Sequence, residues 1–480
     1  MQERRNQLFR IALLISLPLA MTVILALTFN ITVGNAAHIK DDFPYEKLDS
    51  YGCEFSSHLP IIVIQTDVSS LYHGSRLAAD MPSPGAIIWL FDSGDENRLT
   101  DIPAEVFNGA TVNYRGYASL NYPKKGYNLK LYDYKSFFEP LDFGFFDLPA
   151  ASEWILRTPY ADKSLLRDWF SYELAASVLS WQPRGKMVQL FTQDGGSGMI
   201  EYQGVYFFCE RITAGEARLN LGEFRIKTSE RIDFDGGGYI YQRDRARPGS
   251  NYMVLSTLPD DQAFRLVHPS RGDMNSRQND NLKKEITFIH EFLTRSGKYA
   301  DIVDNDWDYW NYIDVESFID YFLVSELTKN LDAGLVSTYM HRPVGGRFVM
   351  GPLWDGDWSM GNFQGICDPT LFHVIDRDMI RQLLDDKKFR NSFVERWQFL
   401  RSNKWSDDEI LGLYDSMAEY LAVPAAQNAG RWPEKYEACH LEPRRPQPIT
   451  TSWEEEIYVT REWLINRLNW LDAHIPGLLH

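Results

Sequence analysis

The feature that most constrains the fold is a change of pattern in the middle of the chain. From Leu59 to about Gln242 the sequence consists of short β-branched and aromatic runs bounded by Gly, Pro or Asp, which is the pattern of β-strands. From about Asn281 apolar residues recur at helical spacing instead. The predicted strands are PIIVIQT, AIIWLFD, ATVNYRG, YNLKLYD, EWILRT, KMVQLFT, GVYFFCE and GGYIYQR. The chain is therefore predicted to have an α+β fold, with a β-rich part followed by a helical part.

Each part contains one exception to its pattern. A helix is predicted over residues 165–180 within the β-rich part, and residues 251–276 are expected to be mostly loop. The helical part contains two short strands, VSTYMH and GRFVMG, joined by a turn at Gly345 and Gly346. Since no long Gly/Ser linker separates the parts, we expect two lobes of one domain.

The N-terminus carries an apolar segment of the length that spans a membrane. Residues 11–29 are uncharged, and a bilayer-spanning helix needs about 20 such residues. Basic residues precede this segment and acids follow it, which predicts a cytoplasmic tail (1–10), a transmembrane signal-anchor (11–33) and a linker (34–58) before an extracytoplasmic domain. The alternative is a signal peptide cleaved near GNAAH, which would make the protein secreted.

Composition limits the partners. The formal net charge is -17, so nucleic acid, which requires a basic surface, is not an expected partner. The four cysteines, Cys53, Cys209, Cys367 and Cys439, are too widely spaced for a CxxC metal or redox motif. Disulfides and buried thiols both remain open, and Cys209 is expected to be unpaired because it lies within a core strand.

The stretch GPLWDGDWSMGN places Asp355 and Asp357 between two tryptophans. A hairpin returns its second strand beside its first, so Asp332, just before VSTYMH, is predicted to lie near Asp355. Three converging carboxylates repel one another, and a divalent cation relieves that repulsion. The alternative is that these acids are ordinary helix caps and turn residues.

A basic stretch in this acidic chain indicates a second site element. Residues 112–132 include Lys125 and Lys130, and strict alternation in YNLKLYD places Lys130 on the polar face of its strand. Lys130 is either a solvent-facing lysine or a cation for nucleotide phosphates, with Glu173 of the 165–180 helix as its carboxylate partner. Glu210 ends an apolar strand and is a candidate hinge residue, or a structural partner of Arg211 or Lys186.

These motifs carry a resemblance to a known family. YRGYASLNYPKKGYNLKLY is similar to the RGxSSxxxPKKSYxIK signature of the CotH spore-coat kinases, and LLRDWFSYELAA resembles their LLRNxLAYEL helix. GVYFFCERI, GGYIYQRD, GPLWDGDWSMG and REWLINRLNWLD resemble further blocks of that family in the same order. The resemblance spans roughly residues 59–472.

The resemblance implies a bilobal protein-kinase-like fold, with an N-lobe over about 59–245, a C-lobe over about 280–472 and a tail at 473–480. It implies a kinase that uses ATP and Mg²⁺ or Mn²⁺ to phosphorylate hydroxyls of secreted or envelope proteins. The residues it assigns are Asp332 as catalytic aspartate, Asp355, Asp357 and Ser337 at the metal, and Lys130, Lys125, Glu173 and Glu210 toward the nucleotide.

Three departures from the family pattern favour an alternative function. Ser337 stands where the family places a metal-binding Asn, Gln242 replaces a glutamate, and Ala118 replaces a serine. The neutral hydroxyl of Ser337 is a weaker metal ligand than the Asn side chain that the family has at this position. The alternative is therefore a catalytically weak or inactive kinase-like scaffold of the cell envelope or extracellular matrix, and a metal-dependent glycan hydrolase is a third, less favoured possibility.

Overall fold

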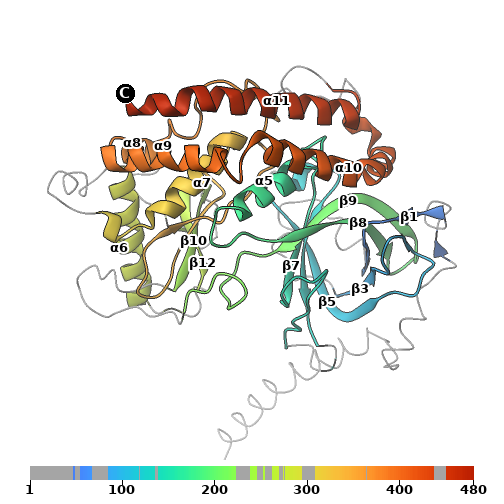
Figure 1. The fold of residues 1–480 in the computed structure, drawn as a ribbon. Coiled ribbons are helices and arrows are strands. Elements are labelled where there is room, and N and C mark those ends of the chain that lie inside the picture. Colours follow the sequence, from blue (N-terminus) through green and yellow to red (C-terminus); the bar gives the residue numbers. More distant parts are fainter. Residues whose placement is uncertain are drawn as a thin grey trace, which may run out of the picture.

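The computed structural model describes residues 47–48, 54–66, 85–117, 119–133, 135, 139–222, 238–245, 252–253, 262–269, 274, 276–294, 309–363, 365–436 and 450–480. Within these ranges the fold combines a β-barrel, a second sheet and a layer of helices, so the α+β class is confirmed (Figure 1). The predicted membrane segment, residues 11–33, lies outside the described residues. Among those described, no helix is long and apolar enough to cross a bilayer.

Seven strands form a closed barrel in the order β2-β3-β5-β6-β7-β9-β8. Their bounds are β2 Ile61–Thr66, β3 Gly85–Phe91, β5 Glu105–Arg115, β6 Gly126–Leu131, β7 Glu153–Arg157, β8 Gly185–Asp194 and β9 Ile200–Glu210. Neighbours are antiparallel except β2 and β8, which pair in parallel and close the barrel. The predicted N-lobe of a bilobal kinase-like fold is therefore wrong in form. The β-rich part is a barrel because β2–β8 pairing removes both sheet edges.

The barrel interior follows from alternation along the strands. On β6, Tyr127, Leu129 and Leu131 are buried and Lys130 is partly exposed, as the alternation predicts. The inward residues pack against aromatic side chains from β7 and β9, including Trp154 and Phe208. Cys209 of β9 is a buried free thiol, as expected.

A second, antiparallel sheet has the strand order β11-β12-β10-β13-β14. Its strands are β10 Tyr239–Arg245, β11 Tyr252–Met253, β12 Gln262–His268, β13 Thr338–Arg342 and β14 Val349–Met350. The β13–β14 hairpin forms as predicted. β10, expected in the N-lobe, instead pairs with β13, and β12 lies where a loop was predicted, because pairing partners distant in sequence complete both strands. A separate small pair joins β1 Ser56–Ser57 and β4 Asn97–Arg98.

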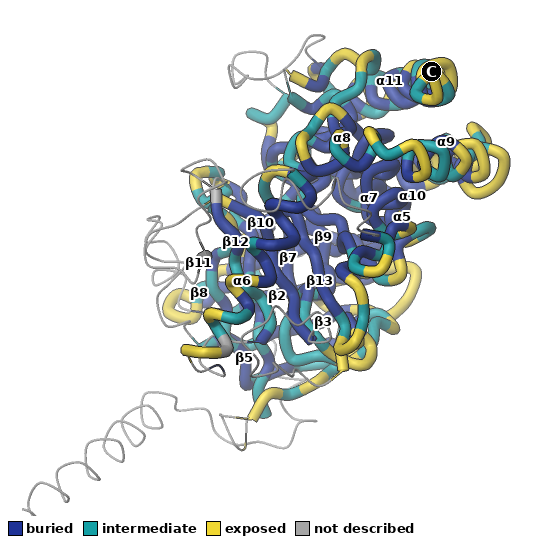
Figure 2. Tube along the Cα trace, turned by 90° about the vertical axis from the view of Figure 1, so that its left-hand side faces the viewer, coloured by how far each residue is buried: buried dark blue, intermediate teal, exposed yellow. Residues whose placement is uncertain are grey.

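The helices form a layer over the barrel and the second sheet (Figure 1). They are α5 Arg167–Ala176, α6 Ser276–Leu293, α7 Val315–Thr328, α8 Asp378–Leu384, α9 Lys387–Arg401, α10 Asp407–Arg431 and α11 Trp453–His474. Side-chain caps from Asp314, Ser406 and Ser452 begin α7, α10 and α11. α7 is the central helix and is buried, whereas the outer helices show an exposed face (Figure 2).

Candidate active site

The two segments that carry the predicted acids lie side by side. The backbone amide of Leu331 donates to the carbonyl of Trp358 at 3.0 Å, and that of Met360 donates to Thr328 at 2.7 Å. Buried Asn330 joins the segments, because its side-chain amide donates to the carbonyl of Asp355 at 3.1 Å while its oxygen accepts from the amide of Asp332 at 2.9 Å. The structure thus brings Asp332 and Asp355 together, as the hairpin argument expects.

Asp332 lies in a turn whose backbone is hydrogen-bonded to Arg377. The guanidinium of Arg377 donates to the carbonyl of Leu331 at 2.6 Å and also to that of Ala333. Burial and the charge of Asp355 raise the pKa of Asp332 to about 7, and the charge of Arg377 only partly opposes this. Asp332 is therefore a carboxyl group that can hold or release a proton near neutral pH.

Asp355 has cationic and hydroxyl partners on both carboxylate oxygens. Oδ1 accepts from Nη2 of Arg157 at 2.8 Å, and Oδ2 accepts from the hydroxyl of Ser337 at 2.7 Å. Burial would raise the pKa of Asp355, but the charges of Arg157 and Arg115 and the bond from Ser337 hold it below its usual value. Asp355 and Ser337 both have left-handed backbone conformations, with φ of 53° and 51°, which are uncommon outside glycine.

Asp357 and Asp168 add further negative charge. Burial, followed by the charges of Asp168 and Asp355, raises the pKa of Asp357 well above its usual value. Asp168, in the first turn of α5, accepts from the amide of Gly356 at 2.7 Å. The site is thus an acidic cluster of Asp168, Asp332, Asp355 and Asp357, and the positive charges that act on it include Arg157, Arg115 and Arg377.

Arg157 and Asp168 were not singled out from the sequence. A signal for Asp168 was present, since it stands where the resembling LLRNxLAYEL motif has Asn. Arg157 ends β7 and bonds to Asp168, eleven residues later, and to Asp355, 198 residues later. The second separation is far beyond what a local pattern can indicate.

The predicted pairing of Lys130 with Glu173 does not form. Lys130 on β6 stands opposite Glu153 on β7, and their charged atoms lie 3.3 Å apart. Directly opposed residues on neighbouring strands are close enough to pair, so Lys130 is already paired within the barrel. Glu173 faces outward on α5 and accepts from the indole of Trp169 at 3.2 Å. The role of either residue toward a nucleotide stays a prediction.

The remaining predicted residues have identifiable structural partners. Lys125 donates to the carbonyl of Leu120 at 2.7 Å. Glu210 is fully buried and pairs with Arg184 and Arg218, each at 2.6 Å. The predicted partners of Glu210 were wrong, since Arg211 points instead to Glu153 across the barrel wall. Their roles as nucleotide contacts also stay predictions.

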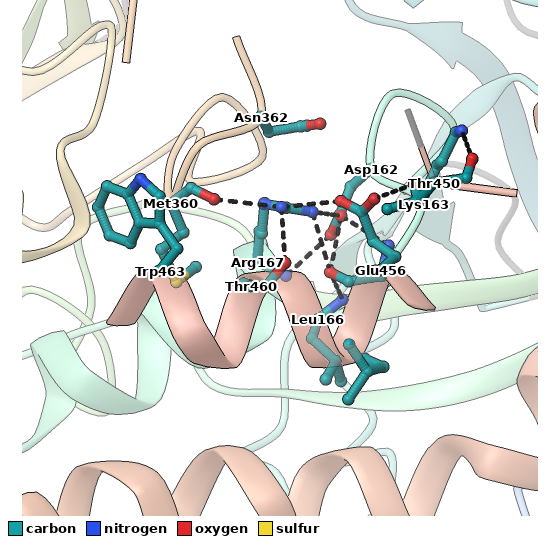
Figure 3. A network of polar contacts seen from close by, with 12 residues as sticks. Asp162, Lys163, Leu166, Arg167, Met360, Asn362, Thr450, Glu456, Thr460 and Trp463 are labelled. Carbon is teal, nitrogen blue, oxygen red and sulfur yellow. Dashed lines mark hydrogen bonds and ion pairs between the residues drawn. The ribbon is translucent and has the colours of Figure 1, made fainter. Parts of the chain in front are cut away.

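A second ion network holds the segment that follows Asp357 (Figure 3). Arg167 of α5 bonds to the carbonyls of Ser359 and Met360 at 3.1 and 3.2 Å. The same guanidinium pairs with Asp162 and, at 2.9 Å, with Glu456 of α11. Helix α11, near the end of the chain, therefore fixes the position of the acid-bearing segment through one buried arginine.

The predicted metal ligands Asp355, Asp357 and Ser337 are not arranged as a metal group, and their role at a metal stays a prediction. Among the residues described, no three His, Cys, Asp or Glu side chains come together in a way that could hold a metal ion. The predicted three-carboxylate metal group is therefore not formed. The physical reason is visible at Asp355, where Arg157 and Ser337 occupy the two oxygens.

Residues 112–471 match the family model described as CotH kinase protein. This range begins within β5 and ends within α11, so it includes most of the barrel, the second sheet and the helices, and it contains every residue of the acidic cluster. No curated protein matches the chain.

Proposed function

Because this chain belongs to the CotH kinase protein family, we propose that it is a kinase-like phosphotransferase that binds ATP beside the acidic cluster and phosphorylates protein hydroxyls. The family match supports the kinase class. The nucleotide, the acceptor and the chemistry at individual residues are the parts that this proposal adds.

The observation that carries the proposal is the position of Asp332, in a turn that Asn330 and Arg377 hold beside Asp355. A general base works best when its pKa lies near the working pH, and burial together with Asp355 brings the pKa of Asp332 to about 7. Arg377 and Asn330 hold the turn of Asp332 in place. Such a carboxylate, fixed in position and near neutrality, suits proton removal from a hydroxyl group.

The acceptor hydroxyl oxygen forms a bond to the terminal phosphorus of ATP, the bond from that phosphorus to the bridging oxygen breaks, and ADP leaves with the electron pair. The hydroxyl proton passes to a carboxylate oxygen of Asp332. Most of the acceleration in such a transfer comes from positioning and from stabilising charge on the phosphoryl oxygens.

Positive charge for the phosphates is proposed to come in part from the chain itself. Arg115, at the end of β5, lies with its guanidinium carbon 5.5 Å from the ring centre of Trp354 and acts on Asp355. Arg115 is the proposed phosphate contact. Lys130 and Lys125 remain the candidates from the sequence.

We also propose that the domain works outside the cytoplasm, anchored by the apolar segment at residues 11–33 or secreted after its cleavage. The basic residues before that segment and the acids after it support this orientation. Its substrates would then be secreted or envelope proteins. A net charge of -17 argues against a nucleic-acid partner.

Phosphate transfer onto the protein itself or onto an added protein acceptor tests the function. The full chain, purified in detergent, is incubated with γ-labelled ATP, with and without a chelator. Label is expected in the wild type and should fall at least 100-fold in Asp332→Asn, as for loss of a general base (roughly 10²–10⁴-fold). Asp415→Asn, an exposed ion-pair residue, is the matched control. Equal labelling of the wild type and Asp332→Asn would refute the assignment.

A second candidate function is a kinase-like scaffold without turnover. The observation that favours it is that Asp355, the family's metal-binding position by resemblance, is already neutralised by Arg157. No label under any cation, together with partner capture that is independent of ATP and unchanged in Asp332→Asn, would support the scaffold.

A further inference from the structure

One guanidinium bridges two carboxylates of the acidic cluster. Nε and Nη2 of Arg157 lie 2.8 and 2.7 Å from Oδ2 of Asp168, and Nη2 lies 2.8 Å from Oδ1 of Asp355. Arg157 is only 5% exposed. A positive charge that belongs to the chain thus lies directly on Asp355.

The position of this guanidinium is fixed from several sides. Its carbon lies 4.6 Å from the ring centre of Trp354 and 5.9 Å from that of Tyr172, within cation–π distance. Asp168 is itself fixed by the amide of Gly356. Since an arginine side chain does not lose its proton in a protein, this charge is permanent.

The guanidinium and a divalent cation would compete for the same oxygens. A metal ion at Asp355 would approach Oδ1, where Nη2 of Arg157 lies, or Oδ2, where the Ser337 hydroxyl lies. At Oδ1 the ion would have to displace a buried arginine, and at Oδ2 it would bind one carboxylate oxygen away from the same positive charge. Leaving a buried charge unpaired costs several kcal/mol.

We propose that Arg157 is a tethered cation that takes the place of a divalent metal at Asp355, so that this site holds no Mg²⁺ or Mn²⁺ at millimolar concentration. The inference rests on the proposed function only for identifying the cluster as the nucleotide site. It predicts that any nucleotide binding at the cluster needs no added divalent ion.

Binding of Mn²⁺ alone tests the inference, with no nucleotide present. The full-length protein in detergent is titrated with MnCl₂, and free Mn²⁺ is followed by electron paramagnetic resonance. The wild type is expected to show no saturable site tighter than about 1 mM. Arg157→Gln should gain a site at least tenfold tighter, about 1.4 kcal/mol, and Arg157→Gln/Asp355→Asn should lose it again.

Two outcomes would overturn the proposal. One is a wild-type site tighter than about 0.1 mM that disappears in Asp355→Asn. The other is Arg157→Gln folding normally but gaining no affinity for Mn²⁺. Arg461→Gln, which removes an equal charge from an exposed pair with Asp415, is the matched control and should bind as the wild type does.

A second variant covers the case in which Arg157→Gln does not fold. Arg157→Gln/Asp168→Asn removes one positive and one negative charge, so Asp168 is not left as an unpaired buried carboxylate. It should gain the same Mn²⁺ site at Asp355 and Asp357, and failure to do so in the folded protein would refute the proposal. The Mn²⁺ titration and the phosphate-transfer assay are separate measurements. The proposal for Arg157 can therefore fail while the proposed kinase function holds, and the reverse is also possible.

Discussion

Two buried arginines, ten residues apart, each pair with two carboxylates, but the two clusters differ in how fully their charges are compensated. Arg167 pairs with Asp162 and Glu456, and Arg157 pairs with Asp168 and Asp355. Asp162 has its acceptors filled, by the amide and hydroxyl of Ser164 and by the amide and guanidinium of Arg167. The Arg167 cluster is a structural ion network, fully hydrogen-bonded at Asp162, that connects α5, α11 and the segment after Asp357.

The Arg157 cluster is not balanced in this way. It continues into Asp357 and Asp332, whose pKa values are raised by burial and by neighbouring carboxylates. Nη1 of Arg157 is buried and finds no hydrogen-bond partner in the part of the chain that the structure describes. Structural ion clusters satisfy their members, whereas excess charge that the fold tolerates indicates a functional site. Substitutions in the two clusters test this difference.

The largest effect is expected from Arg167→Gln. The change leaves Asp162 and Glu456 buried without their cation and releases the carbonyls of Ser359 and Met360. Stability should fall by about 3–5 kcal/mol, as for other broken buried pairs. Urea unfolding followed by circular dichroism measures it. Arg461→Gln should cost less than about 1 kcal/mol, since its pair is exposed. Equal losses of stability in the two variants would contradict a structural role for the Arg167 ion network.

Removing one carboxylate from each cluster should have opposite signs. Asp162→Asn removes the counter-ion of Arg167 and should destabilise the protein by about 3 kcal/mol. Asp357→Asn removes a carboxylate whose pKa is raised by burial and by Asp168, so it should stabilise the protein at pH 8. The gain should be on the order of 1 kcal/mol, because the residue as a whole is only half-buried. Destabilisation by Asp357→Asn in the same denaturation experiment would show that both clusters are structural.

Asp332 makes the comparison depend on pH. Its pKa is about 7 in the folded protein, above the ordinary value of 3.8, so the folded state binds the proton more tightly. The contribution of this group to stability is therefore full below about pH 4 and is lost as pH rises through 7. Asp332→Asn should be more stable than the wild type by about 1–2 kcal/mol at pH 8 and similar at pH 4, measured by denaturation in a chelator. A difference that does not change with pH would contradict the raised pKa.

The smallest effect is expected at Ser337. Ser337→Ala removes the hydroxyl that donates to Oδ2 of Asp355, worth about 1 kcal/mol. The loss should shrink in Asp355→Asn, because the two residues share one interaction. A double-mutant cycle measures this coupling, and a value of zero would place Ser337 outside the cluster.

Much of the fold could be predicted because its signals are local. Every strand run named from the sequence forms a strand, and the β13–β14 hairpin forms where the turn at Gly345 predicts it. Hairpin geometry then brought Asp332 beside Asp355. Closure of the barrel by β2 and β8, and the pairing of β10 with β13, could not be predicted, since each joins segments distant in sequence.

The order of residues along the chain was sufficient for most element types, for the family and for the acids Asp332, Asp355 and Asp357, because periodicity and motif spacing act over a few residues. It did not reveal which cation those acids would meet. Lys130 pairs with Glu153 because the register of β6 and β7 places them opposite each other. Arg157 contacts Asp355 because β7, α5 and the segment after β14 pack against one another. Charge pairing in a folded protein depends on distances of a few ångströms, and those distances exist only after the chain has packed.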